Sequence, residues 1–196
     1  MRPACLTDMD RKPPWGESGS TIHLSTCEVF MKAYTEQLME YNYWANGLIV
    51  KHVEKLTADQ FLEQIPLFKA NLRDILSHTL FAEWSWLKRF EGIEMTREER
   101  REFFRPEKYT TLQQLVNDWL DVELRLRAFL GKMDEEQIGS LFRFTVHDGR
   151  VFEYRYVDIF TQLAFHGMQH RSECAAILTE MGHSPGNIDY IIFTQR

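Results

Sequence analysis

The segment FHGMQHRSECAAILTEMG, residues 165–182, combines a repeating apolar pattern with two histidines, His166 and His170, four positions apart. Four residues turn an α-helix by about 400°, so both imidazoles project from nearly the same face, about 6 Å apart along the axis. This spacing lets two imidazoles converge on one cation, as in helical HExxH sites, although here no glutamate follows the first histidine. Two histidines alone hold a metal weakly, so a metal site needs a third ligand from another element.

The helix that contains this segment is expected to run from about residue 156 to residue 181. Gly182 then ends it, and Pro185 prevents its continuation. Just before it, LFRFTVHDGRVFEYRYV (residues 141–157) alternates apolar and polar residues around Asp148-Gly149. An Asp-Gly pair favours the two-residue type I′ turn, which needs positive φ at both positions. The pattern therefore predicts a short β-hairpin before the last helix.

Three earlier stretches repeat apolar residues at spacings of three to five, which is typical of helices with one buried face. They are expected to run from Cys27 to about Lys55, from about Phe68 to Phe90, and from a cap at Thr110 or Thr111 to about Phe129. The charged residues 93–109 are interpreted as a surface connector with one helical turn. The prediction is an all-α four-helix bundle with a hairpin between the third and fourth helices, in one domain over residues 27–196. Residues 1–26, rich in Pro, Gly and Ser, are interpreted as a flexible leader.

The composition argues against several kinds of partner. A chain of 196 residues with a formal net charge of −6 and no basic stripe is not expected to bind nucleic acid. No apolar run reaches the roughly 18–20 residues that a membrane span needs, so no membrane partner is expected. The three cysteines, Cys5, Cys27 and Cys174, lack the paired spacing of a disulfide framework. We therefore expect a soluble protein of a reducing compartment, the cytoplasm.

His78 is the strongest candidate for a third ligand. It lies in the middle of the second predicted helix among apolar residues, where an unpaired polar group costs on the order of 1–3 kcal/mol. The remaining histidines fall in the leader, at element ends or in loops, where a solvated side chain is the default: His23, His52, His147 and His183. Two interpretations stay open at this point. The three mid-helix histidines either form a metal site or are hydrogen-bonded core residues.

Several polar residues have the spacing to support such a site. Glu173 follows His170 by three positions and can orient its imidazole or act as a base. Asp74 precedes His78 by four positions in a similar geometry, although for both acids a solvated or ion-paired carboxylate is the favoured interpretation. On the first helix, Asn42 and Asn46 share one face and can line a pocket. Cys174 continues the ligand stripe, but a small buried hydrophobic residue is the favoured interpretation.

The order of these segments resembles a known family. YNYWANGLI (residues 41–49), ILSHTLFAEWSWLKRF (residues 75–90), the Asp-Gly hairpin and the last helix together are similar to the DinB/YfiT-like superfamily of metal-dependent enzymes. The resemblance covers about residues 29–193. It implies a four-helix bundle in which His78, His166 and His170 hold a divalent metal, nickel or zinc, with manganese or iron as alternatives. Family members commonly have HRGQ where this chain has HRSE, so Ser172 and Glu173 depart from the pattern.

Three neutral imidazoles leave a divalent ion with its full charge and at least one open position, which is the mark of a catalytic site. Such an ion makes bound water or a thiol markedly more acidic. Relatives in the superfamily resemble thiol S-transferases and thiol-dependent isomerases. The resemblance therefore implies a thiol S-transferase-type reaction on a small electrophilic substrate, with a low-molecular-weight thiol as co-substrate and a homodimer as the assembly. The alternatives are a metal-dependent hydrolase, a non-catalytic metal-binding stress-response or sensor protein, and a purely structural bundle.

Overall fold

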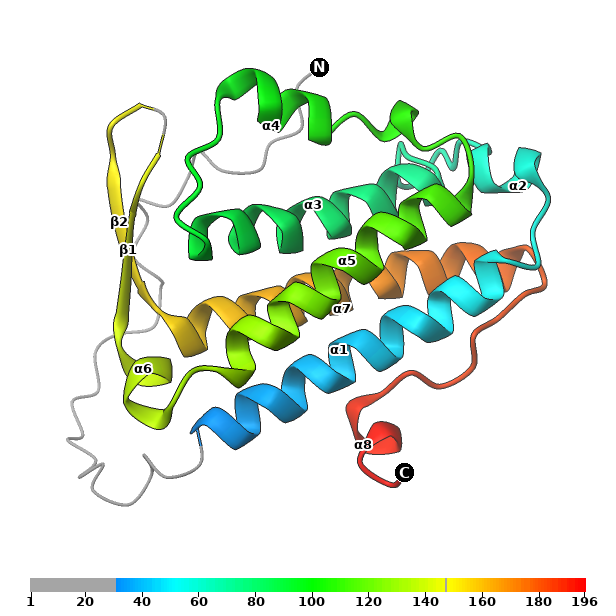
Figure 1. Cartoon of the computed structure of the whole chain (residues 1–196). Helices are drawn as coiled ribbons and strands as arrows, with labels where there is room; N and C mark the ends of the chain where they lie inside the picture. Colours follow the sequence, from blue (N-terminus) through cyan, green and yellow to red (C-terminus); the bar gives the residue numbers. More distant parts are fainter. Residues whose placement is uncertain (1–30, 147) are drawn as a thin grey trace, which may run out of the picture.

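Four long helices form the body of the molecule (Figure 1). A computed structural model describes residues 31–146 and 148–196. Helix α7 packs against α1 and α3, and α5 packs against α3 and α1, so the four helices enclose one core. The predicted all-α four-helix bundle with a hairpin before the last helix is confirmed. The bundle helices are α1 (Met31–Val53), α3 (Leu72–Phe90), α5 (Leu112–Gly131) and α7 (Tyr156–Glu180).

The start of α3 differs from the prediction. The apolar repeat suggested a start near Phe68, but the helix begins at Leu72. The side chain of Asn71 accepts a hydrogen bond of 2.9 Å from the backbone N–H of Asp74, which caps the helix at this point. Ahead of the cap the chain turns sharply, with Lys69 at φ 51° and a β-bridge between Ile65 and Ala70. The first helical residue is therefore set by its cap rather than by the apolar pattern.

The charged connector is more ordered than the single turn expected. Thr96 and Glu99 form a capping box that starts α4, and Tyr109 follows a further 3₁₀ turn. The shorter helices are α2 (Ala58–Leu62), α4 (Arg97–Phe103), η2 (Pro106–Lys108), α6 (Glu135–Gly139) and α8 (Tyr190–Phe193). Figure 1 shows α4 alongside α3, on the side of α3 away from α1.

The hairpin consists of antiparallel strands β1 (Leu141–Thr145) and β2 (Val151–Arg155). The expected two-residue turn is wrong. The N–H of Val146 donates to the carbonyl of Arg150 over 2.9 Å, which leaves a three-residue loop, and Gly149 has φ 84°. A loop of this length uses a left-handed residue at its end, a role that glycine fills without strain. Residue His147 lies outside the described part of the chain.

The core is built from the inward faces of all four long helices. Its largest fully buried side chains include Phe160 of α7 and Leu80 of α3. Gly182, with φ 77°, follows α7 as predicted and accommodates the left-handed conformation that ends a helix. Within the described ranges, no helix combines the length and apolarity that crossing a bilayer requires. The predicted leader, residues 1–26, and the predicted helix start at Cys27 lie outside the described residues.

Candidate metal centre

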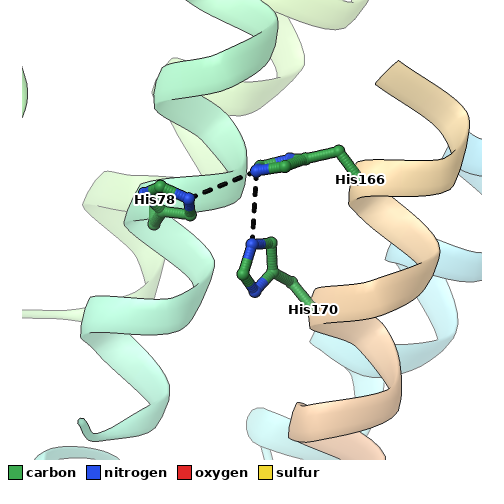
Figure 2. A group of neighbouring side chains, drawn as sticks. All are labelled: His78, His166 and His170. Atoms are coloured by element: carbon green, nitrogen blue, oxygen red, sulfur yellow. Dashed lines mark hydrogen bonds between the residues drawn. The ribbon is translucent and has the colours of Figure 1, made fainter. Parts of the chain in front are cut away.

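The imidazoles of His78, His166 and His170 point toward one another between α3 and α7 (Figure 2). The Nε2 atom of His166 lies 3.2 Å from Nε2 of His78 and 3.2 Å from Nε2 of His170. One ring nitrogen from each residue falls within 4.8 Å of the others, and all three residues are half-buried. Among the described residues, this is the group of His, Cys, Asp and Glu side chains that can hold a metal ion.

The spacing of the three nitrogens fits a metal ion better than a hydrogen-bonded core. A ring nitrogen either donates one proton or accepts through one in-plane lone pair, so Nε2 of His166 can satisfy only one of its two 3.2 Å contacts. Two nitrogens bound at about 2.0–2.1 Å to a tetrahedral ion lie about 3.3 Å apart. The donor set and these two separations are therefore compatible with a three-histidine metal site.

Glu173 fixes the orientation of one imidazole. Its Oε2 atom lies 2.7 Å from Nδ1 of His170. A carboxylate can only accept, so Nδ1 of His170 carries the proton and Nε2 presents its lone pair to the other two histidines. This arrangement is the carboxylate–histidine pair that commonly supports a metal ligand. The predicted orienting contact of Glu173 is therefore present in the structure.

The environment favours the neutral imidazoles of His166 and His78. The pKa of His166 is lowered to about 4, mainly by burial and in addition by the positive charges that His170 and His78 would carry. Burial also lowers the pKa of His78, with a second contribution from His170, while the carboxylate of Glu173 acts in the opposite direction. Neutral imidazole is the form that binds a metal, so the lone pairs of His166 and His78 are available near pH 7.

An aromatic cluster from α3 and α4 borders the histidines. The ring of Phe104 meets the ring of His78 edge-on at 5.8 Å, and Phe81 lies 4.9 Å from Phe104. Trp84 and Phe103 stack at 3.8 Å and extend the cluster. Phe104 remains 46% exposed, so it presents an apolar surface to a ligand beside the site. Sequence reasoning missed this cluster; the Phe103-Phe104 pair within a charged connector was the available signal.

A buried polar network behind the histidines joins three helices. The carboxylate of Glu83 on α3 is 1% exposed. It accepts hydrogen bonds of 2.9 Å from Asn42, 3.5 Å from Asn46 and 2.8 Å from the indole N–H of Trp119. The two asparagines, expected to line the pocket, have their amides committed to this core network. The apolar periodicity of α3 did not indicate a role for Glu83. Its position belongs to the buried face of the helix, which an apolar residue could equally occupy.

Arg171 connects this network to α7. It follows His170 directly, is 2% exposed, and donates through Nη1 to the side-chain oxygens of Asn46, at 2.8 Å, and Asn42. Its guanidinium also lies 5.4 Å from the ring of Tyr41. The two asparagines of α1 thus connect Arg171, next to His170 on α7, with Glu83 on α3. Helix α3 also carries His78. This connection fixes α7 against α3 through α1.

Gly167, between the two histidines of α7, makes room for the network. A Cβ atom at this position would lie 2.4 Å from Oδ1 of Asn42 and 2.6 Å from Nη1 of Arg171. Real Cβ atoms essentially never approach so closely, so any other residue would displace the asparagine or the arginine. The glycine therefore allows α1 and α7 to approach each other at the level of the histidines.

Two other candidate residues have different roles from ligands. The carboxylate of Asp74 accepts hydrogen bonds of 3.1 Å from its neighbour Arg73 and is not part of the histidine group. Cys174 is fully buried, and burial raises the pKa of its thiol, which favours the protonated form. It therefore packs as a small hydrophobic residue, the interpretation favoured from the sequence.

Comparison with known proteins places the chain in a family. The model of the DinB family matches residues 31–196, and this range includes all of the residues that the structure describes. The chain is also similar to the protein named Protein DinB from Bacillus subtilis (strain 168), with 22% identity over 165 residues. That alignment covers 83% of this chain and 95% of the relative. This chain belongs to the DinB family.

Proposed function

We propose that this protein is a divalent-metal-dependent enzyme that transfers a low-molecular-weight thiol to a small electrophilic substrate. The observation that carries the proposal is the gathering of one ring nitrogen from each of three histidines within 4.8 Å, with two contacts of 3.2 Å that cannot both be hydrogen bonds. Nickel or zinc suits three imidazoles, and manganese or iron is the alternative. When bound, such an ion supplies an open position and makes a thiol acidic enough to react near neutral pH.

The chain itself would contribute binding and orientation. His78, His166 and His170 would hold the ion, and Glu173 would keep the Nδ1 proton of His170 in place, so that its Nε2 lone pair faces the ion. The exposed ring of Phe104 would bind the apolar part of the electrophile beside the open position and exclude water from it. In the transfer, the sulfur–carbon bond forms, the leaving group departs with its electron pair, and the thiol proton passes to solvent.

A thiol-consumption assay tests this proposal. Full-length protein loaded with zinc or nickel is incubated with chlorodinitrobenzene and glutathione, bacillithiol or mycothiol. We expect metal-dependent thiol consumption with at least one thiol, lost in His166→Ala and retained in His183→Ala, whose histidine lies outside the group. Metal binding without turnover by any thiol would contradict the transferase proposal. Release of chloride without thiol consumption would support the hydrolase alternative, and absence of both reactions would support a sensor.

A further inference from the structure

Arg89 sits in an unusual environment on α3. Its guanidinium lies 5.0 Å from the ring of Trp86 and 5.1 Å from the ring of Phe144 on β1. Nη1 donates to the backbone carbonyl of Ser85 over 2.8 Å, which bends the side chain back toward the start of the helix. Two aromatic contacts and one backbone hydrogen bond hold the group in one orientation. Its other N–H groups have no hydrogen-bond partner among the described residues.

No acidic side chain neutralises this cation. Within residues 31–146 and 148–196, no carboxylate oxygen lies within 4.0 Å of the Arg89 guanidinium. Partial burial and the nearby positive charge of Arg100 on α4 lower the pKa of Arg89 to about 10, so it is still charged at pH 7. Seven other arginines of the described residues have a carboxylate partner: Arg73, Arg105, Arg125, Arg127, Arg143, Arg150 and Arg155.

Arg89 lies on the same face of α3 as His78. Eleven residues turn a helix by about 1100°, which returns to within about 20° of the starting direction. Because the guanidinium bends back to Ser85, it lies about 10 Å along the axis from the level of His78. The residues between them on this face, Ala82 and Ser85, are small. The hydroxyl of Ser85 is buried and has no hydrogen-bond partner among the described residues.

We propose that Arg89 binds an anionic group, a carboxylate or a phosphate, on the ligand whose reactive atom occupies the three-histidine centre. The anion would lie against the guanidinium of Arg89, beside the aromatic rings that hold it and about 10 Å from that atom along α3. A guanidinium with free N–H groups recognises a planar carboxylate or a phosphate with two parallel hydrogen bonds. This inference rests on the proposed function only for the reactive end of the ligand.

The test compares two thiols of equal length on cobalt-loaded, full-length protein. One is ω-mercaptohexanoate and the other is ω-mercaptohexanol, and their binding is followed by the sulfur-to-cobalt absorption band. We expect the carboxylate to bind at least tenfold more tightly than the alcohol. Arg89→Gln should abolish this preference. Arg143→Gln, which removes an exposed arginine of the hairpin that carries Phe144, should retain it. Equal affinities in the wild type, or a preference retained in Arg89→Gln, would overturn the proposal.

A packing role for Arg89 gives a different result. If the side chain only holds the hairpin against α3, then Arg89→Gln lowers the melting temperature but leaves the carboxylate-to-alcohol affinity ratio unchanged. Arg89→Lys keeps the charge but loses the two parallel hydrogen bonds, so it should retain only part of the preference. The ratio is measured on folded protein in every case, so a general loss of stability does not imitate the expected result.

Two further experiments complete the test. One determines which co-substrate carries the anion, and the other distinguishes failure of the anion site from failure of the proposed thiol transfer. Turnover with ω-bromohexanoate and a neutral thiol, compared with ω-mercaptohexanoate and a neutral electrophile, shows by its dependence on Arg89 which co-substrate carries the anion. If neither thiol produces the cobalt band, the thiol-transfer function fails. The anion site is then tested on metal-free protein, where hexanoate but not hexanol should raise the melting temperature of the wild type and not of Arg89→Gln. Absence of that shift would overturn it.

Discussion

Gly167 on α7 lies directly against the side chain of Asn42 on α1. In the variant Gly167→Ala, the new Cβ meets Asn42 and Arg171, and we expect a loss of about 1–3 kcal/mol in the free energy of unfolding. Chemical denaturation measures this loss. The matched control is Gly47→Ala in α1, where nothing lies within 4 Å, and there alanine should stabilise by roughly 0.5–1 kcal/mol. Equal effects of the two substitutions would contradict the close packing at Gly167.

Glu83 gives the buried network a predictable pH dependence. Burial raises its pKa above the ordinary value of 4.5, although the donors Trp119 and Asn42 and the charge of Arg171 oppose this change. A carboxyl with a raised folded-state pKa contributes stability that is present below the unfolded pKa and is lost as pH rises through the folded pKa. We therefore expect the stability of the wild type relative to Glu83→Gln to fall as the pH rises from about 4.5.

Denaturation of both metal-free proteins across this pH range isolates the Glu83 contribution, because all other titrating groups are shared. Glu83→Gln should still be the less stable protein overall by about 1–3 kcal/mol. The amide nitrogen of the substituted glutamine cannot accept a hydrogen bond. The buried N–H of either Trp119 or Asn42 is therefore left without an acceptor. A stability difference that rises with pH would contradict the raised pKa.

At the scale of elements, the start of α3 determines the placement of His78, which lies two turns into the helix. Asn71 is buried and caps α3 through Asp74. Asn71→Ala should cost about 1–2 kcal/mol and speed hydrogen exchange in the first turn of α3. The matched control is Thr96→Ala, which removes the cap of the short, exposed helix α4 and should change global stability less. Unchanged exchange at the start of α3 in Asn71→Ala would refute the capping role.

The sequence predicts elements well where a local pattern determines them. The apolar repeats of the four long helices, the cap at Thr110 or Thr111 and the glycine after α7 depend on neighbours within a few residues. These predictions are confirmed, with Thr111 as the cap. The start of α3, the length of α4 and the loop of the hairpin were wrong. Each depends on competition between a local cap or turn and a neighbouring pattern, which apolar periodicity does not resolve.

At the scale of the whole molecule, the HxxxH spacing predicted that His166 and His170 lie together, because helix geometry alone brings them to one face of α7. The mid-helix position of His78 made it a candidate, but the family resemblance was needed to group it with these two, since His166 lies 88 residues away in sequence. The network could not be predicted, because its bonds join residues as distant as Asn42 and Arg171, and no local repeat connects them. The fold provides these contacts by placing α1 and α3 on either side of α7.

The most direct test of the three-histidine centre is metal stoichiometry with identification of the ligands. Full-length protein is dialysed against zinc or nickel, analysed by plasma mass spectrometry and examined by X-ray absorption spectroscopy. We predict one ion per chain with three imidazole nitrogens at about 2.0–2.1 Å, and loss of stoichiometric binding in His78→Ala, His166→Ala and His170→Ala but not in His183→Ala. Stoichiometric binding that survives in His78→Ala, or a wild type that binds no metal, would contradict it.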